Sequence, residues 1–139
     1  MAINEVITIE TIVNKDMDYI WAYWTEPEHI MKWNNALEDW HTPSAENDLR
    51  VGGTFTYKMA AKNGSFSFDF GGVYDEVKYG KQIAYTLGDG RKVAIDFTEL
   101  DGGVKIIETF EAEETNSLEM QRGGWQAIFD HFKHYAETN

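Results

Sequence analysis

Apolar and polar side chains alternate along much of the chain, which is the pattern of β-strands that bury one face. The first such run, from Ile3 to Val13, is rich in β-branched residues and places Ile7, Ile9 and Val13 on one face. The alternation returns after Val51 in five further runs, whose apolar positions are Phe55, Tyr57 and Met59; Phe66, Phe68 and Phe70; Ile83, Tyr85 and Leu87; Val93, Ile95 and Phe97; and Val104, Ile106 and Phe110.

The segments between these runs have the composition of tight turns. Asn63-Gly64, Asp89-Gly90 and Asp101-Gly102-Gly103 are hairpin signals, because Asn, Asp and Gly tolerate the backbone angles that two-residue turns require. Sequential hairpins predict an antiparallel meander of about five or six strands. Within it, Gly71-Gly72 predicts a bulge or a bend.

Three segments have helical rather than strand character. Asp16 can cap a short helix that runs to about Trp24, and Pro27 fits the first turn of a second one over Glu28–Lys32. The segment Asn34–Asp48 has no periodicity and is predicted to be a long loop. A final helix is expected from Asn116 to about Glu137, with Asn116 and Glu119 as a capping pair. Its apolar face comprises Leu118, Gln121, Trp125, Ile128, Phe129, Phe132 and Tyr135.

This order predicts an α+β fold in a single domain over residues 1–139. A curved antiparallel sheet would wrap around the long C-terminal helix, with two short helices after the first strand. Both the strands and the helix present an aromatic face, so these faces are expected to meet, with Trp125 buried between them.

Composition excludes several classes of function. The net charge of −12 repels phosphate backbones and anionic lipids, so we expect neither nucleic-acid binding nor membrane insertion. Cysteine is absent, which excludes disulfides and thiolate metal sites. Without a recognisable secretion signal or an apolar span, a cytoplasmic protein is expected. Aromatic residues make up 14% of the chain and either fill a core or line a pocket.

Three motifs, in this order, resemble those of a known superfamily. The first consists of Ile20-Trp21, Thr25-Glu26-Pro27 and Trp33; the second is Asp48-Leu49-Arg50-Val51-Gly52-Gly53-Thr54-Phe55; the third is Gly124-Trp125 followed by Ile128 and Phe132. They are similar to motifs of the START-like (SRPBCC, helix-grip) superfamily, in the group related to the activator of heat-shock protein 90 ATPase. The chain departs from that pattern at Asn14–Met17, where relatives often carry Ala-Pro; this affects a helix cap.

The resemblance implies a helix-grip fold but leaves the function open. The superfamily includes lipid and sterol carriers, polyketide cyclases and chaperone activators, and a shared fold does not select among them. The hypothesis developed from the residues is a binding module for a small hydrophobic molecule, held between sheet and helix. The alternatives are a protein-interaction module with a protein partner, like the chaperone activators, and a polyketide cyclase- or hydrolase-like enzyme. No cofactor is expected, and the protein is expected to be a monomer or a weak dimer.

The expected cavity walls follow from the shared aromatic faces. They are Phe55, Tyr57, Phe68, Phe70, Tyr85, Phe97, Trp125 and Phe129, with Tyr57, Tyr85, Gln121 and Glu108 as polar groups that could orient a ligand. Trp33 and Trp40 flank or occupy the long loop. They would either cover one end of the cavity or pin the loop by packing.

Glu108 shares its strand parity with Val104, Ile106 and Phe110, which places a carboxyl group on the apolar inner face. Related sequences usually look apolar at this position. A buried carboxylate is unfavourable unless it is hydrogen-bonded or protonated, so Glu108 is a candidate for ligand contact. Alternatively, a bulge shifts the register, or the side chain reaches water or a basic partner.

Nothing in the sequence assembles a catalytic or metal centre. None of the common metalloprotease, nucleophile-elbow or phosphate-loop motifs is present. His131 and His134 are three residues apart in the last helix, with Asp130 beside them, but they lie on the side away from Trp125. They are expected on a solvated face.

Overall fold

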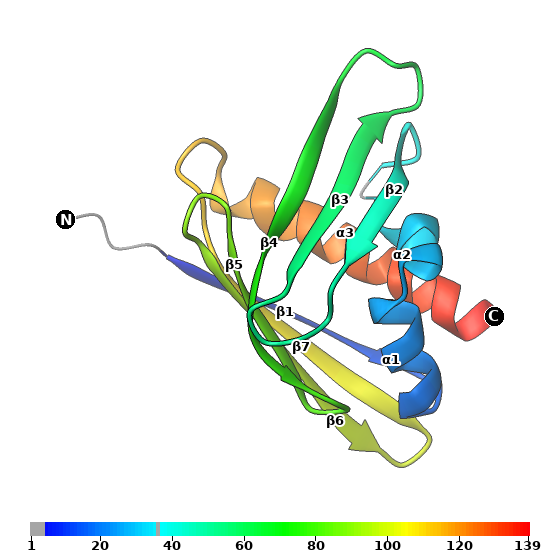
Figure 1. The fold of residues 1–139 in the computed structure, drawn as a ribbon. Coiled ribbons are helices and arrows are strands. Elements are labelled where there is room, and N and C mark those ends of the chain that lie inside the picture. The colour runs from blue at the N-terminus through cyan, green and yellow to red at the C-terminus, as the bar shows by residue number, and fades with distance from the viewer. Residues whose placement is uncertain (1–4, 36) are drawn as a thin grey trace.

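The predicted helix-grip architecture is confirmed in a computed structural model, which describes residues 5–35 and 37–139 (Figure 1). The predicted start of the first strand, at Ile3, lies outside the described residues. In chain order the elements are β1 (Val6–Val13), α1 (Met17–Thr25), α2 (Pro27–Trp33), β2 (Trp40–Asn47), β3 (Thr54–Ala61), β4 (Ser67–Lys78), β5 (Gln82–Leu87), β6 (Lys92–Leu100), β7 (Gly103–Glu111) and α3 (Leu118–Thr138).

The seven strands form one antiparallel sheet in the order β1-β7-β6-β5-β4-β3-β2. The strands β2, β3 and β4 stand at a steep angle to β1, β6 and β7, so the sheet curls into a half-barrel (Figure 1). The alternation predicted from the sequence is visible in the burial of β7, where every second residue from Val104 to Phe110 faces inward. The chain therefore places β1 and β2 at opposite edges of the sheet.

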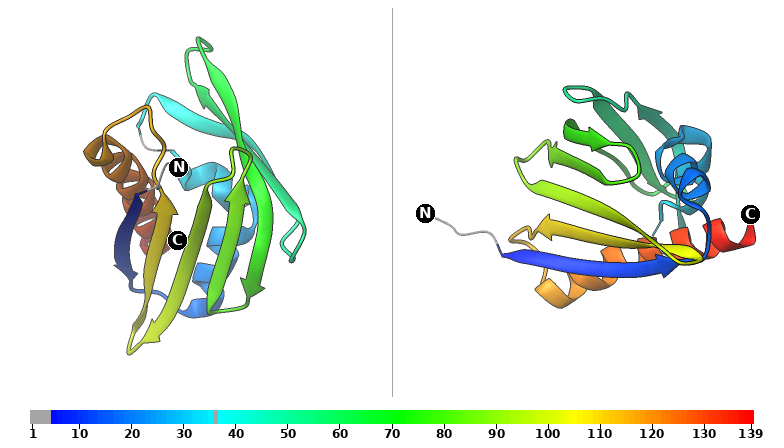
Figure 2. Two further views of the ribbon diagram at one scale, coloured as in Figure 1. Left: turned by 90° about the vertical axis from the view of Figure 1, so that its left-hand side faces the viewer. Right: turned by 90° about the horizontal axis from the view of Figure 1, so that it is seen from below.

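The long helix α3 runs alongside the β1 edge, as the right-hand view of Figure 2 shows. Side chains of α3 bond to backbone carbonyls along β1. Arg122 Nη1 donates to the Thr8 carbonyl at 2.8 Å, and Lys133 Nζ donates to that of Ile12. Unpaired strand edges are templates for aggregation, and this helix covers one of them.

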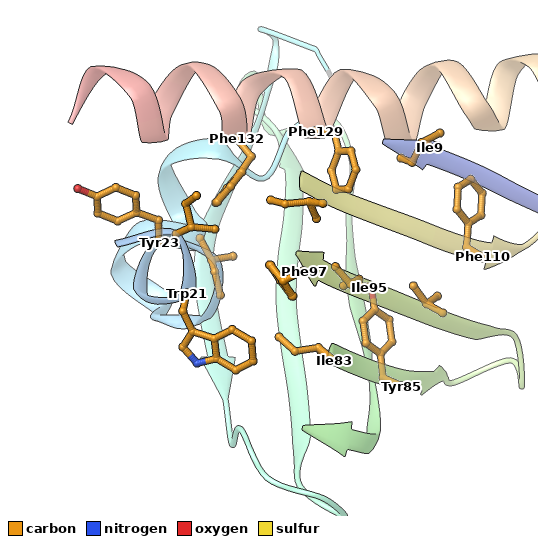
Figure 3. Packing of buried hydrophobic residues seen from close by; sticks show 14 of the residues in the cluster. Ile9, Trp21, Tyr23, Ile83, Tyr85, Ile95, Phe97, Phe110, Phe129 and Phe132 are labelled. Carbon is orange, nitrogen blue, oxygen red and sulfur yellow. The ribbon is translucent and has the colours of Figure 1, made fainter. Parts of the chain in front are cut away.

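An aromatic cluster fixes the C-terminal half of α3 to α1 and α2. Trp24 stacks on Trp33 with ring centres 4.9 Å apart, and Phe132 meets these two rings edge-on at 4.8 and 4.9 Å. Phe129 is also edge-on to Trp24 at 5.7 Å. Phe129 and Phe132 are fully buried, and both point from α3 toward the sheet and the short helices (Figure 3). The interior is therefore filled at this end.

The predicted loop over Asn34–Asp48 is wrong in part, since Trp40–Asn47 forms β2 and pairs with β3. The register of this pairing shifts between His41 and Ser44, around Pro43. A bulge on an edge strand breaks the alternation that reveals a strand in sequence. The periodicity test therefore missed β2.

Of the bulge or bend predicted at Gly71-Gly72, the bulge is not found there. Pairing continues through both glycines, and the register shift of β4 lies further along, between Tyr74 and Glu76. The glycines instead allow neighbouring backbones to approach closely. A Cβ atom on Gly71 would lie 2.4 Å from the Phe55 carbonyl oxygen, and one on Gly72 would lie 2.4 Å from that of Thr86.

The N-cap of the last helix lies one residue later than predicted, and the helix itself begins at Leu118. Ser117, rather than Asn116, is the N-cap, and its side chain accepts a hydrogen bond from the Met120 backbone N–H at 3.1 Å. Within the helix, a Cβ atom on Gly123 or Gly124 would meet nothing within 4 Å, so close approach of a strand does not explain these glycines. No helix in the described ranges is long and apolar enough to cross a membrane.

These environments predict opposite effects of the same substitution. Gly123→Ala should stabilise the protein by about 1 kcal/mol, because alanine favours a helix and its methyl group meets no obstacle. Gly72→Ala should destabilise it by about 2 kcal/mol or more, because the new Cβ collides with backbone. Urea unfolding of both variants measures this; a destabilised Gly123→Ala would contradict the described helix packing.

Candidate functional site

A cavity of about 320 Å³ lies between the N-terminal half of α3 and the inner face of β3, β4 and β5. It begins where the aromatic cluster ends, with Trp24 and Trp33 forming its boundary toward the filled end. Its apolar lining comprises Trp24, Trp33, Phe55, Met59, Phe68, Phe70, Ile83, Met120, Trp125 and Ile128. Exposed side chains such as Met120 and Phe68 mark where this space reaches the molecular surface.

Most of the residues proposed from the sequence line this one space. They are Trp33, Phe55, Tyr57, Phe68, Phe70, Tyr85, Glu108, Gln121 and Trp125. Trp125 was predicted to be buried, but it is half-buried. Its ring stacks on Phe110 with centres 3.9 Å apart and planes 9° apart, which leaves its other face to the cavity.

Three of the proposed residues lie outside the cavity. Phe97 and Phe129 both pack edge-on against Trp24, with ring centres 6.1 and 5.7 Å apart, and neither lines the open space. Trp40 instead lies near the tips of β3 and β4, where it contacts Phe66 and Phe68 at 6.0 Å. Its contacts are those expected of a side chain that pins the chain by packing.

Other residues also line the cavity, although the sequence pattern did not predict them. They are Trp24, Asn34, Met59, Tyr74, Ile83, Arg91, Glu113, Asn116, Met120, Gly124 and Ile128. Met59, Ile83 and Ile128 lie on the predicted apolar faces and could have been found from periodicity. Arg91, Glu113 and Asn116 lie outside the helices and strands, where no periodic signal exists.

Gln121 contributes a wall of the cavity, but its amide group is occupied by the protein. Its Oε1 accepts from the Glu113 backbone N–H at 2.8 Å, and its Nε2 donates to the carbonyls of Glu113 and Asn116 at 3.1 and 2.9 Å. These bonds tie the β7–α3 connection to the helix. Gln121 is therefore a positioning residue at the rim of the cavity.

A chain of hydrogen bonds likewise engages two of the cavity tyrosines. The Tyr57 hydroxyl bonds to that of Tyr74, which donates in turn to Asn47 Oδ1. Asn47 Nδ2 then donates to the Thr25 carbonyl at 2.6 Å, which anchors the chain in α1. Burial raises the pKa of Tyr57 well above its usual range and that of Tyr74 to about 12, so both hydroxyls stay protonated.

Glu108 lies on the inner face, as its strand parity predicts, and is only 5% exposed. Ile9 and Ile95 flank it on the neighbouring strands. Its carboxyl group forms no hydrogen bond or ion pair with any residue in the described part of the chain. Loss of water around this group raises its pKa from 4.5 to about 8. At neutral pH the carboxyl group is thus mainly protonated.

The Tyr85 hydroxyl resembles Glu108 in lacking a hydrogen-bond partner among the described residues. Tyr85 is 8% exposed and lines the cavity from β5. Burial and then the Glu108 charge raise its pKa well above its usual range, so the two groups are electrostatic neighbours. No fully enclosed side-chain N or O atom within residues 5–35 and 37–139 lacks a partner, so both groups retain access to the cavity.

Charge in the lining is confined to Arg91, Glu113 and the ionisable Glu108. Arg91 precedes β6, and its Nε donates to Asp89 Oδ2 at 2.7 Å, which contributes to lowering the pKa of Asp89. Among the described residues that line the cavity there is no His, Ser, Thr or Cys. The cavity therefore offers no conventional nucleophile–base pair.

The histidines lie elsewhere. Within the described ranges, one group could gather metal-ligating atoms, namely Glu26, Glu28 and His29. However, His29 Nδ1 already bonds to the Tyr135 hydroxyl at 2.6 Å, and both glutamates are exposed. In α3, His134 is exposed as predicted, whereas His131 is half-buried and bonds through Nδ1 to the Asn35 carbonyl.

Comparison with known proteins places this geometry in a family. Residues 16–137 match the family described as "Activator of Hsp90 ATPase homolog 1-like protein". No curated protein matches the chain.

Solved structures show the same relationship. An AHSA1-like protein from Aeromonas hydrophila is 40% identical, with a TM-score of 0.91 over 96% of this chain and 93% of that one. A protein from Cytophaga hutchinsonii is 56% identical, with a TM-score of 0.83 over 96% and 92%. A protein from Nitrosomonas europaea shares the fold at 18% identity, with a TM-score of 0.82 over 96% and 94%. The chain belongs to the family of Hsp90 ATPase activator homologue 1-like proteins.

Proposed function

We propose that this protein binds a small, largely apolar molecule in the cavity between α3 and the sheet. The observation that carries the proposal is an aromatic-lined space of about 320 Å³ next to a fully packed core. Ligand sites typically span about 300–1,000 Å³ and combine apolar walls with a few polar groups. The volume lies at the small end of this range, which favours a compact ring compound or a short chain.

The chemistry of the lining supports binding over catalysis. Glu108 is the one ionisable acid deep in the space, and acid–base catalysis commonly uses a second group within hydrogen-bond reach of the substrate. Glu113, the other carboxyl group in the lining, is half-buried and follows β7. A buried, unpaired carboxyl group also weakens a fold, and such conflicts concentrate at functional sites.

A second candidate is a protein-interaction role, which the family description suggests by naming an activator of the Hsp90 ATPase. Its structural support is a set of exposed apolar side chains, with Phe66 60% exposed and Met120 64% exposed. The ATPase rate of an Hsp90 chaperone, measured with and without this protein, tests that role. An increase that survives blocking of the cavity would favour it over the first.

The ligand-binding proposal predicts that a cavity-filling substitution abolishes binding. A library of small aromatic and aliphatic compounds should contain members that raise the melting temperature by several degrees, since a ligand at 100 times its Kd adds about 2.7 kcal/mol of stability. Ile128→Trp, which fills the cavity, should remove these shifts. Val73→Trp is the matched control, because Val73 is an exposed residue of β4 outside the lining.

Native mass spectrometry of the freshly purified protein provides a second readout, because a co-purifying molecule would appear as added mass. Circular dichroism of both variants checks that they fold. The proposal fails if no compound shifts the melting temperature, or if Ile128→Trp and the control respond alike.

The raised pKa of Glu108 predicts how stability depends on pH. The folded protein keeps this proton up to about pH 8, whereas the unfolded chain releases it near 4.5. The unfolded state binds fewer protons in this window. The contribution of Glu108 to the free energy of unfolding therefore falls as the pH rises, by roughly 4–5 kcal/mol in total. The glutamine in Glu108→Gln cannot titrate. The free energy of unfolding of this variant, relative to that of the natural protein, should therefore increase by about this amount between pH 4 and pH 9.

Urea unfolding at pH 4, 6 and 9 measures this difference. Glu99→Gln serves as the control, because Glu99 is exposed near the end of β6 and should follow the natural protein at every pH. Parallel curves for Glu108→Gln and the natural protein would show that Glu108 is solvated in the folded state.

A further inference from the structure

The polar groups of the cavity divide into those that the protein uses and those that it leaves free. Gln121, Tyr57 and Tyr74 are held by hydrogen bonds to other parts of the fold. Glu108 and Tyr85 are more than nine-tenths buried, line the cavity and have no hydrogen-bond partner among the described residues. These two groups lie close enough for the Glu108 charge to raise the pKa of Tyr85, so together they indicate what a ligand must offer in this apolar space.

We infer that the cavity selects an uncharged molecule with a hydroxyl or carbonyl group, which Glu108 and Tyr85 bind by hydrogen bonds. This inference rests on the proposed ligand-binding function and adds the chemical class of the ligand. The apolar part of the molecule would lie against the aromatic walls of β3, β4 and α3. Its oxygen atom would lie near β5 and β7, the strands that carry Tyr85 and Glu108.

The surroundings of Glu108 favour an uncharged partner. The residues that flank it across β1 and β6 are Ile9 and Ile95, and α3 presents the uncharged Gln121 and Trp125 to the cavity. No cation forms an ion pair with Glu108 within the described ranges. A protonated carboxyl group both donates and accepts a hydrogen bond, as a tyrosine hydroxyl does. Together, the Glu108 carboxyl group and the Tyr85 hydroxyl can form hydrogen bonds with either an alcohol or a ketone.

The remaining ionisable groups around the cavity do not supply a positive charge at this wall. Tyr57 and Tyr74 reach it from β3 and β4, and burial keeps both hydroxyls neutral through raised pKa values. Arg91 and Glu113 lie just outside β6 and β7, and Arg91 is paired with Asp89. The Glu108 carboxyl group is therefore the group at this wall whose proton can be gained or lost near neutral pH.

Free polar groups in an apolar site also discriminate between ligands. When a ligand lacks the matching atom, the protein groups stay unpaired and lose the water they could otherwise bind. Sites built to bond a hydroxyl group accordingly reject analogues without one far more strongly than apolar pockets reject an extra methylene. The same cavity should thus bind a plain hydrocarbon, but less tightly than its alcohol.

Three probes of nearly equal shape test the inference. They are 2-(hydroxymethyl)naphthalene, 2-ethylnaphthalene and 2-(aminomethyl)naphthalene, which differ in one group: an alcohol, a methyl group or, at pH 6, an ammonium ion. Calorimetric titration of the full chain at pH 6 should give the alcohol a Kd roughly tenfold below that of the hydrocarbon. The ammonium probe should bind more weakly than the alcohol.

Variants and pH then assign the preference to the two groups. Glu108→Leu should give the alcohol and the hydrocarbon equal Kd values, and Tyr85→Phe should reduce the preference. For the natural protein, the preference for the alcohol over the hydrocarbon should increase between pH 6 and pH 9, because Glu108 loses its proton above a pKa of about 8 and a carboxylate accepts a stronger hydrogen bond from an alcohol. Glu108→Gln should keep the preference and remove this pH dependence.

The probes separate this inference from the proposed function. If the hydrocarbon and the alcohol bind equally at pH 6 and Glu108→Gln changes neither, the cavity binds ligands but the inference is overturned. Preferential binding of the ammonium probe also overturns it, since Glu108 would then act as a counter-ion. If none of the three probes binds although members of the compound library raise the melting temperature, the inference is overturned and the proposed function stands; if no library member binds either, both proposals fail. The Kd values of the three probes for the natural protein at pH 6 and pH 9 test the inference even where a variant does not fold.

Discussion

The packing of α3 against the two short helices determines where the interior of this protein is filled and where it is open. Phe129 and Phe132 insert beside Trp24 and Trp33, and this cluster holds the C-terminal half of the helix on the fold. The N-terminal half meets this side of the sheet through Trp125, whose ring is edge-on to Phe70 of β4 with ring centres 6.1 Å apart. It is held by Trp125 on Phe110 and by side chains that bond to the β1 edge, so the space in front of it stays unfilled.

Periodicity in the sequence predicted which face of an element is buried, but it could not predict how deep along that face a residue lies. Phe97 and Phe129 have the parity and helical spacing of lining residues, yet both pack against Trp24 and lie outside the cavity. Trp24 itself was not predicted to line the cavity. The edge strand β2 was missed for a related reason, since its bulge near Pro43 removes the alternation.

Glu108 shows both what could be predicted at the site and what could not. Strand parity alone placed its carboxyl group on the inner face, and the structure agrees. Whether that group has a partner depends on side chains from distant parts of the chain, which no local pattern reports. Gln121 makes the contrast clear: it was proposed to orient a ligand on the same grounds, but backbone groups of the β7–α3 connection occupy its amide.

The two halves of α3 therefore differ in role: its C-terminal half packs the core, and its N-terminal half faces the cavity. The aromatic cluster and the pairing of β1, β6 and β7 maintain the fold, while the residues of β3–β5 and the first half of α3 face the cavity. Substitutions that line an open space disturb few packed neighbours, so they change binding more readily than stability. In the proposed ligand-binding role, the specificity of the cavity depends on a few wall residues, and the buried carboxyl group of Glu108, which has no partner among the described residues, is the one that most restricts what can bind.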